Sequence, residues 1–163
     1  MQKADMNGAT FCTSKAALAA GTTTTFSTTG ATLYCINGKA YSTAAGSNAA
    51  TPTLDGNTGE AFLPVPINKG SVFVYAYDGS STAANAIEVY QGTIVDLDAG
   101  GNFTSAPEFP ALPDSVCPFA YELIQVASNG SAWTFGTSNQ SSVTGVTFTR
   151  QDVMVLPDRP QLR

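Results

Sequence analysis

The chain has 163 residues, a length typical of one domain, and 43% of them are hydrophobic, which is sufficient for a buried core. Only 12% are charged and the net charge is −5, so the surface must consist largely of small and hydroxyl-bearing side chains. This balance argues against nucleic acid and anionic membranes as partners, because both attract clusters of Lys and Arg.

The first 21 residues show little hydrophobic periodicity. Their apolar run is too short for the core of a signal peptide, and no later run approaches the length of a membrane span. Ser14 is a candidate N-cap and Gly21 a candidate C-cap, so residues 14–20 are predicted to form a short helix. We therefore expect residues 1–21 to form an arm or a short helix ahead of a single domain at 22–163.

From residue 22 onward the pattern is that of strands and turns. Asn37-Gly38, between two extended runs, predicts a hairpin with a type I′ turn, because this turn needs positive φ at both central positions. Residues 71–78 and 86–98 are predicted to pair as antiparallel strands, and Gly92 marks a bulge in the second. Further strands are expected at 119–127, 132–136, 143–150 and 153–157, with a loop at 44–59. About seven or eight short strands at this spacing predict an all-β fold, an antiparallel β-sandwich of jelly-roll or immunoglobulin type with at most one short helix.

A proline-rich stretch at residues 103–118 interrupts the strands. Its four prolines are incompatible with a regular helix or a central strand. We predict an extended belt that packs through Phe103, Phe109 and Leu112. The string FPALP within it, residues 109–113, either seals the sandwich or offers a stiff contact surface to another protein.

The string DLDAGGN, residues 96–102, begins like the calcium-binding loop of an EF-hand. Asp96 and Asp98 would be the first ligands, but the fifth position is Gly100, which has no side-chain oxygen, and the twelfth is Pro107. The alternative is a strand end whose carboxylates face solvent and whose glycines supply the positive φ of a tight turn. We favour the turn.

Residues for catalysis are scarce. The chain has no histidine, so Ser-His-Asp and Cys-His arrangements are excluded and the commonest general base is missing. Carboxylate pairs for a glycosidase are easily found among 12 acidic residues, so they carry little specificity. The candidates are Asp96, Asp98, Glu108, Asp114 and Glu122. We therefore expect a protein that is not an enzyme and has no cofactor.

Three cysteines, Cys12, Cys35 and Cys117, match no zinc-binding spacing and cannot all pair within one chain. We expect them to be small buried hydrophobes in a protein made in a reducing cytoplasm. An intermolecular disulfide or a reactive thiol is the alternative.

Several strings occur in an order that resembles a group of small structural proteins of tailed bacteriophages: INGKAYST, FPALPDSVCPFAYELIQV, AWTFGTSN and VTGVTFTRQDVMVLPDRPQ. The resemblance spans residues 7–161. It implies a virion protein, foremost a head decoration (cement) protein on the capsid exterior that binds the major capsid protein, self-associates as a homotrimer and is made in the host cytoplasm. A tail, baseplate or fibre-associated protein is the alternative within this class.

The terminal segments and the belt supply the expected contacts with other copies or with the capsid, although either terminus is equally expected to fray. The residues expected at these contacts are Phe11, Leu18, Phe109, Leu112, Arg150, Arg159 and Arg163. A carbohydrate-binding adhesion module is a second hypothesis from another class. Its sugar platform would consist of Tyr75, Tyr77, Tyr90 and Trp133 on one face of a sheet.

Overall fold

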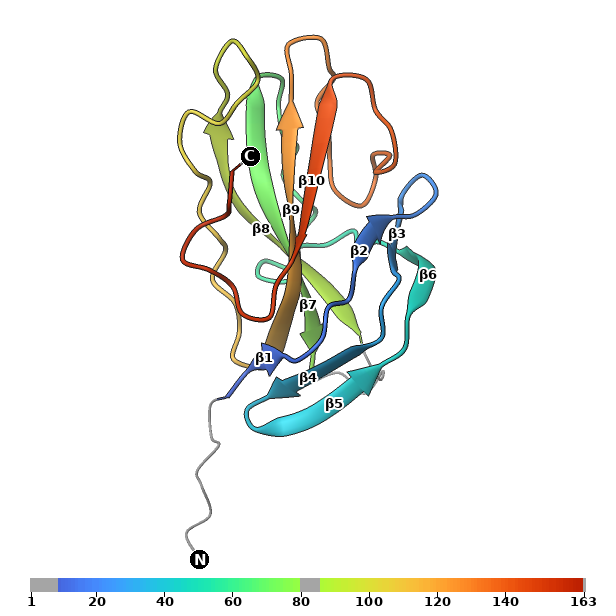
Figure 1. Ribbon diagram of the computed structural model, residues 1–163. Coiled ribbons are helices and arrows are strands. Elements are labelled where there is room, and N and C mark those ends of the chain that lie inside the picture. Colours follow the sequence, from blue (N-terminus) through green and yellow to red (C-terminus); the bar gives the residue numbers. More distant parts are fainter. Residues whose placement is uncertain (1–8, 80–85, 163) are drawn as a thin grey trace, which may run out of the picture.

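The computed structural model describes residues 9–79 and 86–162, and within them the chain forms ten strands and no helix (Figure 1). The strands are β1 (Phe11–Cys12), β2 (Leu18–Ala20), β3 (Thr25–Thr28), β4 (Thr32–Ile36), β5 (Lys39–Thr43), β6 (Gly46–Ala50), β7 (Lys69–Asp78), β8 (Ile87–Asp96), β9 (Val116–Val126) and β10 (Val146–Asp152). They build three antiparallel sheets, in the orders β10-β9-β7-β8, β1-β4-β5 and β2-β3-β6. The predicted all-β antiparallel sandwich is confirmed. No helix that could span a membrane occurs among the described residues.

The four-stranded sheet is the centre of the molecule, and its strand β7 is buried along nearly its whole length. Alternation along β7 sends Phe73, Tyr75 and Tyr77 to one face of this sheet and Val72 and Val74 to the other. Each face therefore packs against its own apolar cluster, which explains why the strand is almost continuously hydrophobic.

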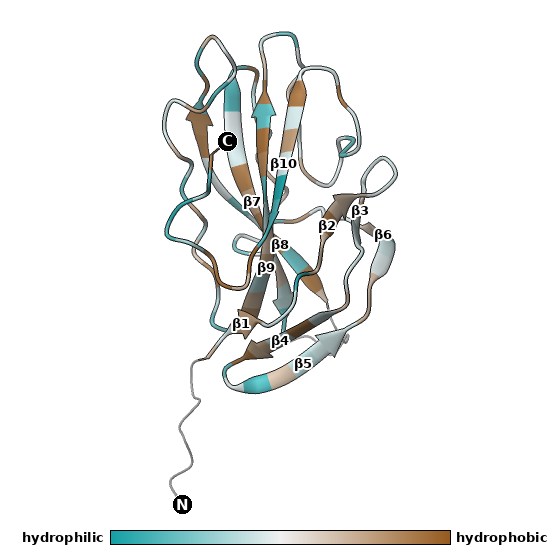
Figure 2. Ribbon diagram, viewed as in Figure 1, coloured by the Kyte–Doolittle hydropathy of each residue, from teal (hydrophilic) through white to brown (hydrophobic). Residues whose placement is uncertain are grey.

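The first face carries an aromatic core between the central sheet and the two smaller sheets. Phe73 stacks on Phe135 with ring centroids 4.9 Å apart, and Trp133 meets Phe73 edge-on at 5.8 Å. Offset-stacked and edge-to-face pairs of this kind stabilise a core beyond the area they bury. Figure 2 shows that β1, β2 and β4 are hydrophobic, whereas the edge strands β5 and β6 are paler.

The second face is covered by the belt and by the residues that follow β10. Phe103, Phe109 and Leu112 pack there, together with Val153 and Leu156. The predicted packing of the belt through its two phenylalanines and Leu112 is confirmed. The prediction that its prolines exclude a central strand is wrong for Pro118, because residues 116–118 belong to β9 and a register shift between β7 and β9 lies beside this proline.

Local turn and bulge predictions are also confirmed. Asn37 and Gly38 have φ values of 50° and 78° and connect β4 to β5. Gly92 lies where the register between β7 and β8 shifts. A Cβ atom at this glycine would be 2.2 Å from the Glu108 carbonyl oxygen, so only glycine lets the belt approach β8 this closely.

The predicted helix at 14–20 is wrong. Ala16 and Leu18 are buried in the first core, Leu18–Ala20 pairs with β3, and Ala17 has a φ of 53° that no helix accommodates. Burial of these side chains outweighs a weak helical propensity. The described part of the expected N-terminal arm thus contributes two strands to the sandwich, while residues 1–8 lie outside the described residues.

Three further element predictions are wrong. The expected loop at 44–59 contains β6, whose small residues occupy the edge of a sheet. Residues 132–136 form only one isolated bridge, between Trp133 and Val65. Residues 153–157 leave the central sheet and run across its second face, so they form no ladder.

Candidate functional site

The short strand β1 lies between β4 and the residues that follow β10. The Cys12 N–H donates to the Met154 carbonyl and the Thr13 N–H donates to the Leu33 carbonyl, both at 2.8 Å. Around this strand three large apolar side chains are exposed: Leu33 at 55%, Met154 at 50% and Val155 at 63%. We call Leu33, Met154 and Val155 the β1 surface.

The exposure of the β1 surface follows from the local structure. Tyr34 points inward and stacks on Tyr77 with centroids 4.5 Å apart, so alternation turns Leu33 outward beside the exposed Thr13. Met154 and Val155 come where the chain leaves the central sheet. Leu33 and Met154 thus flank β1 on its two sides, and large exposed apolar side chains around one strand make this region a candidate for a surface that another protein covers.

The structure uses most of the expected contact residues within the chain itself. Leu18 is buried in the first core, Phe109 and Leu112 pack on the second, and Arg150 forms an ion pair inside the molecule. Phe11 is half-buried, Arg159 is exposed, and Arg163 lies outside the described residues. Sequence reasoning missed the β1 surface, although alternation around Tyr34 is a signal that could have indicated Leu33.

The C-terminal segment is held by its own domain. Leu156 packs on the second core, Pro160 is buried, and the Gln161 N–H donates to the Tyr121 hydroxyl at 3.0 Å. These contacts place the segment against its own domain as far as Gln161. Leu162 follows and is 42% exposed.

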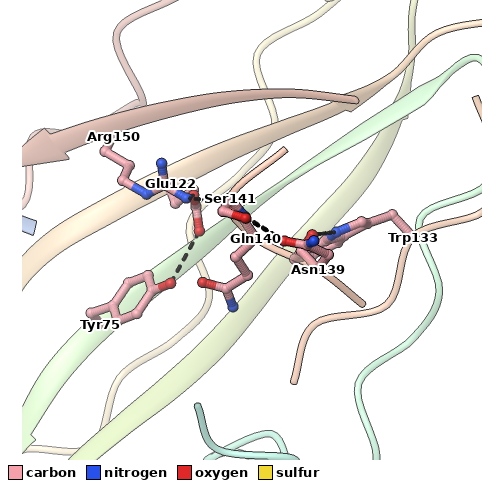
Figure 3. A network of polar contacts seen from close by, with 7 residues as sticks. All are labelled: Tyr75, Glu122, Trp133, Asn139, Gln140, Ser141 and Arg150. Carbon is pink, nitrogen blue, oxygen red and sulfur yellow. Dashed lines mark hydrogen bonds and ion pairs between the residues drawn. The ribbon is translucent and has the colours of Figure 1, made fainter. Parts of the chain in front are cut away.

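A polar cluster lies inside the first core (Figure 3). Glu122 on β9 is completely buried, and its Oε2 accepts a hydrogen bond from the Tyr75 hydroxyl at 3.0 Å. Arg150, directly opposite on β10, forms an ion pair with Oε1. Burial raises the pKa of Glu122 to about 7, and the nearby guanidinium and the tyrosine hydrogen bond partly offset this shift.

Gln140 closes the cluster from the loop before β10. Its backbone carbonyl accepts a hydrogen bond from the Arg150 guanidinium at 3.0 Å, and its backbone N–H donates to the Thr23 carbonyl at 2.8 Å. The side-chain amide is buried beside the Tyr75 hydroxyl without an aligned hydrogen bond. Both Tyr75 and Glu122 are inaccessible, so the cluster offers no open position to a substrate and instead holds this loop against the sheet.

The carboxylates of the DLDAGGN string are engaged in a turn and an ion pair. Asp98 accepts the backbone N–H groups of Gly100 at 2.9 Å and Asn102 at 2.8 Å, and these hydrogen bonds lower its pKa. Gly101 has a φ of 81°, and Asp96 pairs with Lys69. The predicted tight turn is confirmed. Among the described residues no group of three or more His, Cys, Asp or Glu is placed to hold a metal ion.

The proposed sugar platform is wrong. Tyr75, Tyr77, Tyr90 and Trp133 are each at most 1% exposed. Tyr90 also belongs to the second core, on the opposite face of the sheet from the other three. These rings build the interior and cannot stack on a sugar at the surface. The expected burial of all three cysteines is confirmed.

Comparison with known proteins gives no match: no family model matches the sequence, no curated protein matches it, and no solved structure matches the fold. The function of the chain is therefore argued from its own residues and their arrangement.

Proposed function

We propose that this protein is a non-enzymatic structural component of a bacteriophage virion. In this proposal it is a head decoration protein that binds the outer surface of the major capsid protein. The β1 surface is the observation that carries the proposal, because it presents apolar side chains on a stiff all-β scaffold. The likeness of its strings to small structural proteins of tailed phages supports the same function.

The energetics of the β1 surface suit a repeated contact. Leu33, Met154 and Val155 are each half or more exposed, so covering them would contribute about 1 kcal/mol per side chain. One such contact is weak. A shell that carries many copies gains through avidity, because each copy adds a modest contact to a structure that is already assembled.

The scaffold suits this task because little ordering entropy is lost when it binds. Leu33 projects from a paired strand, and Met154 is fixed by the backbone hydrogen bond from Cys12. A surface that is already ordered keeps more of its contact energy as affinity. The charge of −5 and the hydroxyl-rich surface favour protein partners over nucleic acid.

Within this proposal the chain works as a homotrimer, because virion components commonly assemble around symmetry axes and three copies would bury their contact segments together. The virion exterior is then its location, and the host cytoplasm its place of synthesis. A tail or baseplate position would use the same kind of surface. An electron-microscopy map of the intact particle separates these positions.

Co-sedimentation tests the proposal directly. The chain is mixed with phage capsids assembled without it, alongside the double variant Met154→Ser, Val155→Ser and the control Leu63→Ser, which removes another leucine that is 65% exposed. We expect the wild type and the control to pellet with capsids and the double variant to be lost from the pellet. A wild type that never pellets, or a double variant that pellets as well as the control, overturns the proposal.

A further inference from the structure

The fold brings two thiols together from distant parts of the chain. Cys12 on β1 and Cys117 on β9 are 105 residues apart in sequence, yet their Sγ atoms lie 3.6 Å apart. Both side chains are at most 1% exposed. Both sulfurs also face the Pro118 carbonyl, at 3.6 Å and 3.9 Å. The two thiols therefore share one buried site where the β1-β4-β5 sheet meets the central sheet.

We propose that Cys12 and Cys117 form a disulfide when the protein meets an oxidising environment, and that Cys35 remains a thiol. This inference does not depend on the proposed function.

The pairing of β1 with β4 explains why Cys35 is left out. Cys35 is opposite Phe11 in this pairing, whereas Cys12 is opposite Tyr34. Neighbouring residues of a strand point to opposite faces, so Cys12 and Tyr34 enter the first core while Cys35 faces the other way. Cys117 belongs to the same core as Cys12. Cys35 also lies near Cys117, so the orientation of its side chain is what favours the Cys12–Cys117 pair over the other two.

A disulfide requires only a small movement of the two sulfurs. The S–S bond is about 2.05 Å long, so the sulfurs must approach by about 1.5 Å. Cys12 lies on a two-residue strand at the start of the described chain, and a side-chain rotation with a slight shift of β1 supplies this approach. The central strand β9 need not move.

Thiol–disulfide exchange with a small disulfide supplies a balanced route. Cys12 is the attacking thiol, because it lies on the two-residue strand β1, which opens more readily than the central strand β9 that carries Cys117. Cys12 attacks one sulfur of the small disulfide, forms a mixed disulfide and releases one small thiol. Cys117 then attacks the Cys12 sulfur, closes the internal disulfide and releases the second small thiol. Two protein S–H bonds are oxidised, and one small disulfide is reduced to two thiols.

Access to Cys12 comes from opening of β1. This strand has two residues and is held by its pairing with β4 and by one hydrogen bond to Met154. Short edge elements open locally far more often than the whole protein unfolds. Once formed, the cross-link ties β1 to β9 and closes a loop that spans most of the chain, which restricts the unfolded state. The protein would thus be made reduced and become more stable after it leaves a reducing compartment.

Peptide mapping of the wild-type chain tests the pairing. Trypsin cleavage after Lys and Arg places the three cysteines in different peptides, 4–15, 16–39 and 70–150, which end at Lys15, Lys39 and Arg150. The full chain is incubated with oxidised glutathione, alkylated without reduction and digested. We expect a linked pair that joins peptide 4–15 to peptide 70–150, with peptide 16–39 alkylated. A link that includes peptide 16–39, a link between two chains, or a lasting glutathione adduct on Cys12 overturns the proposal.

Thermal unfolding supplies a second measurement with matched variants. The oxidised wild type and the oxidised Cys35→Ala variant should melt at a higher temperature than their reduced forms, and dithiothreitol should reverse this difference. The Cys117→Ala variant should melt at the same temperature after either treatment. Equal melting temperatures for oxidised and reduced Cys35→Ala protein would contradict the proposal, even if Cys117→Ala folds poorly.

Discussion

Replacing Glu122 by glutamine removes a carboxyl group that is completely buried between β7 and β10. In the unfolded chain its pKa has the ordinary value of 4.5, whereas burial in the fold raises it to about 7. Between these pH values the folded protein keeps a proton that the unfolded chain has released. The free energy of unfolding therefore contains a contribution that is complete below pH 4.5 and is lost as the pH rises through about 7. At 1.36 kcal/mol per pKa unit, this contribution is about 3 kcal/mol.

Urea unfolding of wild type and Glu122→Gln at several pH values from 4.5 to 8 measures this contribution. Glutamine is uncharged throughout, so the stability of wild type relative to the variant should fall by about 3 kcal/mol across this range. The control Glu60→Gln changes an exposed carboxyl and should follow wild type.

Parallel pH profiles for wild type and Glu122→Gln would refute the reasoning. That result would mean that the ion pair with Arg150 and the hydrogen bond from Tyr75 offset the whole cost of burial. If the stability of wild type relative to Glu122→Gln instead rises with pH, these two partners outweigh the cost of burying the carboxylate.

Three further changes test other parts of the structure. Gly92→Ala should cost about 1–3 kcal/mol in urea unfolding, because its Cβ would overlap the Glu108 carbonyl, and an unchanged midpoint would mean that the belt yields freely. Gln140→Leu should raise the free energy of unfolding by about 1 kcal/mol, since the buried amide has no aligned partner; a loss of stability would show that the amide is satisfied in solution. Asp98→Ala should lower the melting temperature by the same amount with and without calcium, because its carboxylate holds a turn, and a calcium-dependent effect would favour the cation site.

Turn chemistry was the most predictable part of the fold. Asn37-Gly38 and Gly101 adopt the positive φ values that few other residues tolerate, so the residue types themselves indicate the turns. The long strands β7 and β9 were predictable because runs of β-branched and aromatic residues fit a pleated, buried surface.

Elements whose form depends on distant partners were not predictable. Residues 18–20 become a strand because β3 offers them a partner and the core accepts Leu18. β6 consists of small residues with no strand signal, and it pairs along the edge of β3 that β2 leaves open. In both cases the deciding energy comes from contacts between segments, which a local pattern does not contain.

The candidate sites depend on distant partners in the same way. Glu122 was one of five carboxylates considered, and only the pairing of β9 with β7 and β10 brings it to Tyr75 and Arg150. Cys12 and Cys117 meet because β1 packs against the end of β9. The β1 surface similarly requires the chain after β10 to return to β1.

The position of Trp133 gives the molecule a built-in optical reporter. It is the single tryptophan of the chain, it is 1% exposed, and its indole N–H donates to the Asn139 carbonyl at 2.8 Å. Its ring lies edge-on to Phe73, Phe135 and Phe148, so water reaches it only when the central sheet and the loop before β10 separate. The fluorescence of Trp133 should therefore peak at a shorter wavelength in the native protein than in the unfolded chain. The peak should move to longer wavelength as the sheet and the loop separate, so no attached dye is needed to follow this step.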